Sequence, residues 1–257
     1  MNFFANLKNI VRMEKYSQIV SLGKFCGVAM ELERKGLRNA SYPFDWLISD
    51  SFEKIVSLIK NNFYNFLIPD NLYQESDPSH YYDPMIDIHF FHDFKANLTL
   101  EKQIPKVRMK YKRRIERFYE QIQKPTLFIR YCSGLEDEKY VKKHEREIFE
   151  LITSFNSRNR ILYVMSTQEV NRFVPTDYGG VVYVKHPVYD IERRWIDNVP
   201  GLNKFLYKSI AMSVVDIVKN ILIHYRSRIM KKFVNNNSID TIHVYRHDKQ
   251  TKDLNMY

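Results

Sequence analysis

The chain has 257 residues, of which 44% are hydrophobic, and its formal net charge is +10. This content supplies the core of one large domain, and two cysteines are too few for a disulfide framework. No apolar run approaches the ~18 residues that a membrane-spanning helix needs, and the N-terminus lacks the apolar stretch of a signal peptide. We therefore expect a cytoplasmic protein with reduced thiols.

The first residues favour a short amphipathic helix, because Phe3, Phe4, Leu7 and Val11 recur at helical spacing with basic residues between them. We expect this helix to dock on its own domain; peripheral attachment to the inner face of a membrane is the alternative. The predicted organisation is a terminal helix over residues 1–15, an α/β domain over residues 16–234 and a C-terminal tail over residues 235–257.

A cysteine lies where a predicted strand passes into a predicted helix. Gln18–Leu22 has the pattern of a buried strand, Gly23 of a turn and Val28–Lys35 of a helix. This places Cys26 in the first turn of the helix, where unpaired N–H groups carry about half a positive charge and favour a thiolate. Lys24 adds to the effect. The alternative is that Cys26 is a small apolar residue that fills space under the helix.

The segment SLGKFCGVAMELERKGLRNASYPFDWLI, residues 21–48, closely resembles the signature of a bacterial family of papain-like cysteine peptidases. The matching residues are Ser21, Leu22, Gly23, Cys26, Leu37, Arg38, Ser41, Pro43, Phe44, Asp45 and Trp46. A later His92-Asp93-Phe94 and a strand that ends in Arg130 also look like this family, so the resemblance extends over at least residues 16–130. It implies a thiol-dependent enzyme.

The middle of the chain is predicted to contain two helices, a loop and a strand. These are a helix over Phe52–Phe66, a long loop over Ile68–Pro84, a strand over Met85–Phe91 and a helix over 102–123. Within the second helix, residues 102–117 include eight basic residues and one acid, Glu116. This face either is solvated or binds phosphate or anionic lipid.

Strands then alternate with helices, which predicts a mostly parallel, Rossmann-like sheet flanked by helices in a single α/β domain. The expected elements are strands over Pro125–Tyr131, Arg160–Met165, Val181–Val184 and Thr241–Tyr245, a helix over Glu136–Phe155 and one long or kinked helix over Phe205–Phe233. Ligand sites of such sheets lie at the carboxyl ends of the strands. The chemically useful residues expected at that edge are Gly23 to Cys26, His92, Asp93, Arg130, Ser166, Thr167 and His186.

The first functional hypothesis is a cysteine-dependent hydrolase or acyl transferase. Cys26 is the expected nucleophile, His92 its base, and Asp93 or Asp45 the group that orients the imidazole, while N–H groups after Gly23 hold the oxyanion. His186, with Asp190 or Asn198, is a competing base. The residues expected to contact substrate are Gly23, Lys24, Trp46, Arg130 and His186.

The second hypothesis arises because alternating strands and helices do not build a papain fold. It is a glycosyl or other group transferase for bacterial surface polysaccharide, in which Arg130, Lys24 and the basic helix bind a phosphorylated donor and Asp45 or Asp93 is the base. The positive charge predicts an anionic or phosphorylated substrate or a membrane surface. A nucleic-acid binder ranks last because no binding motif is present. No cofactor motif or metal-ligand spacing is found, so no cofactor and no metal are expected.

Overall fold

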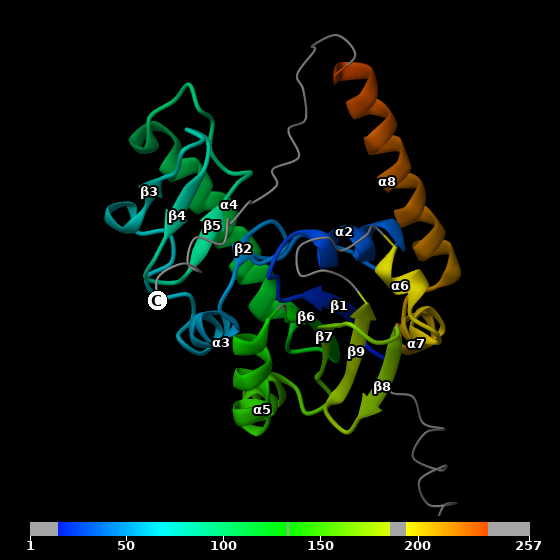
Figure 1. Cartoon of the computed structure of the whole chain (residues 1–257). Helices are drawn as coiled ribbons and strands as arrows, with labels where there is room; N and C mark the ends of the chain where they lie inside the picture. The colour runs from blue at the N-terminus through cyan, green and yellow to red at the C-terminus, as the bar shows by residue number, and fades with distance from the viewer. Residues whose placement is uncertain (1–14, 133, 186–193, 236–257) are drawn as a thin grey trace, which may run out of the picture.

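The computed structural model describes residues 15–132, 134–185 and 194–235 (Figure 1). The predicted N-terminal helix, His186, Asp190 and the strand predicted over Thr241–Tyr245 lie outside these residues. Within them, no helix is both long enough and apolar enough to cross a bilayer.

A five-stranded, mostly parallel sheet forms the centre of the domain (Figure 1). Its strands, in spatial order, are β1 (Gln18–Ser21), β6 (Thr126–Cys132), β7 (Arg160–Thr167), β9 (Gly179–Lys185) and β8 (Arg172–Thr176). The first four run parallel and β8 is an antiparallel edge strand. This confirms the predicted α/β class.

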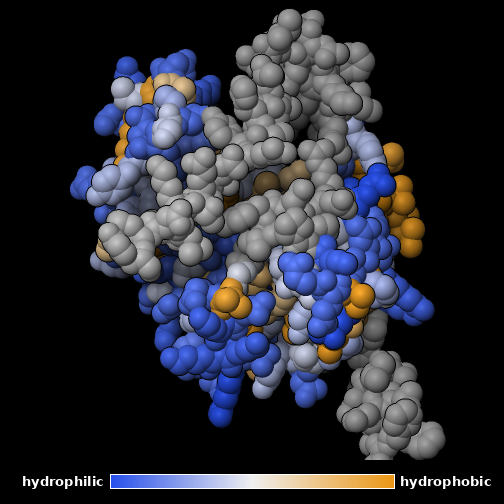
Figure 2. All heavy atoms as spheres, viewed as in Figure 1, coloured by the Kyte–Doolittle hydropathy of each residue, from blue (hydrophilic) through white to orange (hydrophobic). Residues whose placement is uncertain are grey.

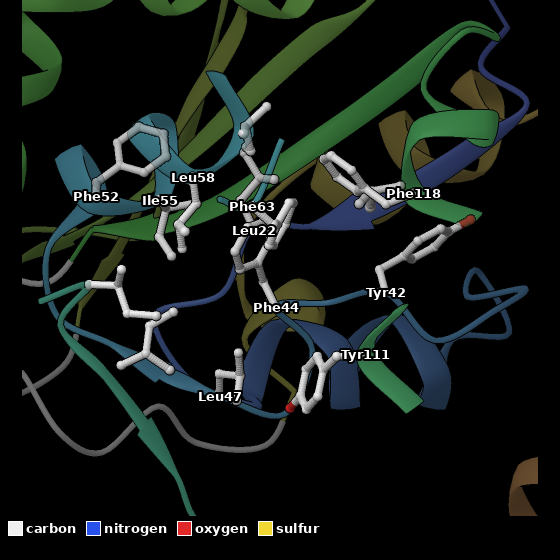
Figure 3. Packing of buried hydrophobic residues seen from close by; sticks show 14 of the residues in the cluster. Leu22, Tyr42, Phe44, Leu47, Phe52, Ile55, Leu58, Phe63, Tyr111 and Phe118 are labelled. Carbon is white, nitrogen blue, oxygen red and sulfur yellow. The ribbon is translucent and has the colours of Figure 1, made fainter. Parts of the chain in front are cut away.

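Helices cover both faces of this sheet, so strand β6 is buried along its whole length. The helices are α2 (Gly27–Arg34), α3 (Phe52–Lys60), α4 (Leu100–Gln121), α5 (Leu135–Phe155), α6 (Trp195–Asn198), α7 (Leu202–Ser209) and α8 (Val214–Asn235). Successive β6 side chains enter opposite cores: Phe128 joins the core beneath α3, α4 and α5, whereas Leu127 and Ile129 join the core beneath α2, α6 and α7. Figure 3 shows the first of these cores, where Phe44 stacks on Phe63 and meets the edge of Phe118.

A second, antiparallel sheet places two short strands in the segment Ile68–Pro84, which was predicted to be a loop, so that prediction is wrong. A third strand lies within the predicted strand Met85–Phe91, as expected. The strand order of this sheet is β2 (Ile48–Ser49), β5 (Ile88–Phe90), β4 (Tyr81–Asp83) and β3 (Tyr73–Gln74), with a 3₁₀ turn at Pro69–Asn71. Strands of two or three residues are too short to show an alternating pattern. Because β5 belongs here, His92 and Asp93 do not extend from a strand of the parallel sheet, contrary to the prediction.

The helix predicted over Phe205–Phe233 is two helices, α7 and α8, separated at Ile210. Ile210 is extended and buried, and Tyr16 bridges the break by donating to the Ser209 carbonyl and accepting from Ala211 N–H. The main-chain pairing with Tyr16 competes with helix continuation, and no local pattern in the sequence reports it. Beyond the break, α8 packs on the end of α2, where Asn220 donates to the Gly36 carbonyl at 3.1 Å.

Candidate active site

The loop between β1 and α2, residues 22–26, is called the cysteine loop below. Gly23 and Lys24 both have φ of +79°, a left-handed conformation that reverses the chain within two residues. Cys26 follows as the residue that begins α2; its carbonyl accepts from Met30 N–H at 2.9 Å and its side chain is half-buried. The Cys26 side chain makes no capping hydrogen bond to α2, and the first-turn N–H groups of the helix follow directly after it. The thiol therefore lies at the positive end of a helix, as the sequence predicts.

Strand β2 holds the cysteine loop from one side. Ser49 N–H donates to the Lys24 carbonyl at 2.8 Å, and Ser49 Oγ accepts from Lys24 N–H at 3.3 Å. The Lys24 ammonium pairs with Asp50 at 2.7 Å. Burial alone would raise the pKa of Asp50, but the bond and charge of Lys24 hold it below its ordinary value. Asp50, which directly follows strand β2, therefore neutralises the charge of Lys24.

Arg130 holds the same loop from beneath. Its guanidinium is fully buried and donates to the Leu22 carbonyl at 3.1 Å, to Ser49 Oγ and O at 2.9 Å each, and to Asp137 Oδ2 at 3.2 Å. Asp137 in turn accepts from Phe52 N–H at 3.0 Å. These contacts make Arg130 a positioning residue for the cysteine loop. A buried guanidinium with four protein acceptors is a poor receptor for the donor diphosphate of the transferase hypothesis.

Asp45 is the centre of the Ser-Tyr-Pro-Phe-Asp-Trp turn. The Asp45 side chain is 1% exposed, and its Oδ2 accepts from Tyr42 N–H at 2.8 Å and from two Arg38 nitrogens at 2.7 and 3.2 Å. Burial raises the pKa of Asp45, and the Arg38 charge opposes the rise. Arg38 also lies over the Trp46 ring at 5.3 Å. These motif residues therefore stabilise one turn, and Ser51 caps the next helix.

His92 and Asp93 are neighbours in the chain with different surroundings. The exposed His92 ring meets the edge of Trp46, with centroids 6.5 Å apart, and burial of part of the ring lowers its pKa. Asp93 instead turns to α4, where it pairs with Lys110 and accepts from Tyr111 Oη at 2.9 Å. The structure thus brings His92 to Trp46 of the signature, while the Asp93 carboxylate acts on the imidazole through its charge alone.

A second histidine, which lies in strand β5 of the small sheet, was missed by the sequence analysis. His89 Nδ1 lies 3.1 Å from Glu75 Oε1, and its ring stacks on Tyr82 with centroids 4.3 Å apart. His89 pairs with Ile48 across the sheet, two residues before Asp50, and its charge contributes to the low pKa of Asp50. A histidine held by a carboxylate is the arrangement that orients a catalytic base. Glu75 lies in the segment predicted to be a loop, so the sequence offered no signal for this pair.

The basic helix α4 uses part of its charge to hold neighbouring segments in place. Arg108 donates to the Leu67 carbonyl at 2.9 Å, Arg117 to the Ser41 carbonyl at 2.8 Å, and Lys110 pairs with Asp93. Lys102, Lys106, Lys112 and Arg113 remain exposed. The phosphate-binding face therefore stays a prediction for these four residues.

A cavity of about 500 Å³ adjoins the supports of the cysteine loop. Its walls are Asp50, Ser51, Glu53, Asp87, Glu136, Asp137, Lys139, Tyr140, Lys143 and His144. Asp50 connects it to Lys24, and Asp137 connects it to Arg130. Across the described residues, no group of three or more His, Cys, Asp or Glu side chains has the arrangement of a metal site.

The comparisons with known proteins give a family but no solved relative. An uncharacterized protein of Acanthamoeba polyphaga mimivirus is 30% identical over an alignment of 169 residues, and the match covers 57% of this chain and 75% of that protein. No solved structure matches the chain. The bacterial origin implied by the resemblance is not confirmed, since this relative is viral, and no match supports the transferase hypothesis. Residues 17–168, which include the cysteine loop and its supports, match the family model described as "Putative papain-like cysteine peptidase", and the chain belongs to that family.

Proposed function

We propose that the protein is a cysteine-dependent hydrolase or acyl transferase with Cys26 as its nucleophile. The observation that carries the proposal is the placement of a half-buried thiol at the start of α2, in a loop held by Ser49 and Arg130. Membership of a family described as cysteine peptidases supports the same chemistry. The second thiol, Cys132, is fully buried, and burial raises its pKa, which makes it a poor nucleophile.

The reaction would proceed through an acyl-enzyme. The Cys26 thiolate forms a bond to the carbonyl carbon of an amide or ester, and N–H groups of the first turn of α2 stabilise the oxyanion. The imidazolium of a histidine gives its proton to the leaving nitrogen or oxygen as the C–N or C–O bond breaks. Water or a second nucleophile then releases the acyl group from sulfur and returns a proton to the histidine.

Two histidines, His89 in strand β5 and His92 just beyond that strand, compete for the role of base. His92 was predicted from the sequence and contacts Trp46, while His89 has a carboxylate partner, Glu75, and lies beside Asp50, the partner of Lys24. These contacts favour His89. Single changes His89→Gln and His92→Gln decide between them, because loss of the true base lowers turnover by about 10²–10⁴-fold whereas loss of the other has a small effect.

The test uses iodoacetamide labelling and turnover of p-nitrophenyl acetate by the full-length protein. Mass spectrometry of the two cysteine peptides gives each labelling rate against pH, and we expect Cys26 to react near neutral pH far faster than Cys132. Cys26→Ser should abolish turnover and leave thermal unfolding unchanged, and Cys132→Ser, the matched control, should retain turnover. Labelling of Cys26 only after unfolding, or full turnover by Cys26→Ser, would sink the proposal.

A further inference from the structure

Helix α8 has an inner apolar face, which contacts α2, and an outer apolar face. The inner face packs on α2: its Ile217 carbonyl and Ile221 side chain lie so close to Gly36 that a Cβ there would be 2.4 and 2.9 Å from them. The outer face presents Val214, Val215, Val218, Leu222, Ile223 and Tyr225, all of them exposed. Figure 2 shows these hydrophobic residues gathered along the edge where α8 lies in Figure 1.

The outer face is continuous and bordered by positive charge. Val214, Val218, Leu222 and Tyr225 follow one another at three- and four-residue intervals, which aligns them along one stripe of the helix. An open groove of about 450 Å³ runs beside this stripe, and its walls include Lys219 and Arg226. The sequence of α8 has one acid and five basic residues, which are Asp216, Lys219, Arg226, Arg228, Lys231 and Lys232.

We infer that the outer face of α8 binds the surface of an anionic lipid membrane. A helix with a continuous apolar stripe flanked on one side by basic side chains can lie in the interface, with its apolar residues among the acyl chains and its basic residues at the lipid phosphates. The net charge of +10 acts in the same direction. The inference is independent of the proposed enzymatic function.

Charge complementarity favours a membrane over a second copy of the chain, or an end segment of the chain, as the partner of this face. In a symmetric dimer, Lys219 and Arg226 of two copies would approach one another, and like charges repel. The two end segments of the chain offer no compensating charge: residues 1–14 contain two basic residues and one acid, and residues 236–257 contain three of each. An anionic lipid surface provides both an apolar phase and negative charge.

The experiment is co-sedimentation of the full-length protein with vesicles of phosphatidylcholine alone or mixed equally with phosphatidylglycerol. We expect binding to the mixed vesicles, weakened by salt. The double change Val218→Glu, Leu222→Glu should lower the affinity by more than about tenfold, because two apolar side chains no longer enter the lipid. The matched control is Val170→Glu, Val174→Glu, which alters two exposed apolar residues away from α8 and should bind as the parent does.

A second pair of variants tests the charge. Lys219→Gln and Arg226→Gln should each weaken binding about fivefold, while Lys139→Gln and Arg146→Gln on exposed parts of α5 should have little effect. Equal binding of the parent and the Val218→Glu, Leu222→Glu protein, or no binding at all, would overturn the inference. Two other results would also overturn it. In the first, the parent forms a concentration-dependent dimer that Val218→Glu, Leu222→Glu dissociates, so a second copy covers the face. In the second, this double change lowers Tm strongly and the parent binds no vesicles, so the chain itself covers the face.

Discussion

Arg130 donates to the carbonyl of Leu22, which is 108 residues earlier in the sequence, and this bond connects the centre of the parallel sheet to the cysteine loop. The same guanidinium reaches Ser49 of the small sheet and Asp137 of α5. The geometry around Cys26 therefore depends on a buried cation that has no need to contact substrate.

Removal of this cation should destabilise the fold. Arg130→Met leaves Asp137 buried without its cation and two carbonyl groups without donors, so we expect a loss of about 3–5 kcal/mol in urea unfolding at neutral pH. The double change Arg130→Met, Asp137→Asn should recover part of the loss, because no charge is then left unpaired. Arg146→Met, at an exposed position of α5, is the control. Unaltered stability of Arg130→Met would contradict the role of Arg130 in holding the cysteine loop.

Substitution of Gly23 should cost more stability than substitution of Gly201, a glycine with nearly the same φ in open space. Gly23 and Gly201 have φ of +79° and +78°, and a Cβ at Gly23 would lie 3.1 Å from the Phe44 carbonyl whereas one at Gly201 would meet nothing within 4 Å. Both Ala variants should lose about 1–2 kcal/mol from the left-handed conformation. Gly23→Ala should lose more in thermal unfolding, and slower labelling of Cys26 should accompany it. Equal losses would show that the loop relaxes around the added methyl group.

Asp83 should limit stability at neutral pH. Its carboxylate is fully buried; Oδ1 accepts from Met85 N–H at 3.0 Å, and Oδ2 has no hydrogen-bond partner among the residues that the structure describes. Desolvation raises its pKa above the ordinary 3.8. The folded state then binds the proton more tightly than the unfolded state, so the contribution of this group to stability declines as pH rises from about 3.8 through the folded pKa.

The corresponding variant is Asp83→Asn, which keeps the acceptor for Met85 and removes the charge. We expect urea unfolding to show a larger gain over the parent at pH 7 than at pH 4. Asp87→Asn is the contrasting control, since both Asp87 oxygens accept bonds, from Ser51 N–H and Tyr82 Oη, and this variant should lose stability. An equal effect of Asp83→Asn at both pH values would show that burial does not raise the pKa of Asp83 in the folded state.

The pH dependence of turnover reports on His92. Desolvation lowers its pKa below 6.5, so the imidazole is neutral at pH 7 and able to accept a proton. If His92 is the base, the acidic limb of turnover should have its midpoint below pH 6.5, and His92→Gln should remove this limb. An unchanged limb in His92→Gln that disappears in His89→Gln would transfer the role to His89.

The sequence predicted the elements whose patterns are long. The β1–turn–α2 placement of Cys26, helices α4 and α5, and the parallel strands of the large sheet are all as expected. Of the small sheet, only β5 was predicted; β2, β3 and β4 were missed because strands of two or three residues are too short to show a pattern. The roles of Arg130 and Asp45 could not be assigned from spacing, because whether a charged side chain contacts substrate or protein depends on its burial.

Ser49 links the small sheet to the large one, since it pairs with Ile88 in the small sheet and bonds the cysteine loop that follows β1. Opening of the small sheet would break the contacts of β2 with the cysteine loop, so we expect Cys26 and the small sheet to belong to one cooperative unfolding unit. The Ser49 amide hydrogen, bonded to the Lys24 carbonyl, should therefore exchange with solvent as slowly as amides of the central strand β6. A thiol enzyme built in this way would lose its reactive geometry only on global unfolding, which couples its chemical activity to its thermodynamic stability.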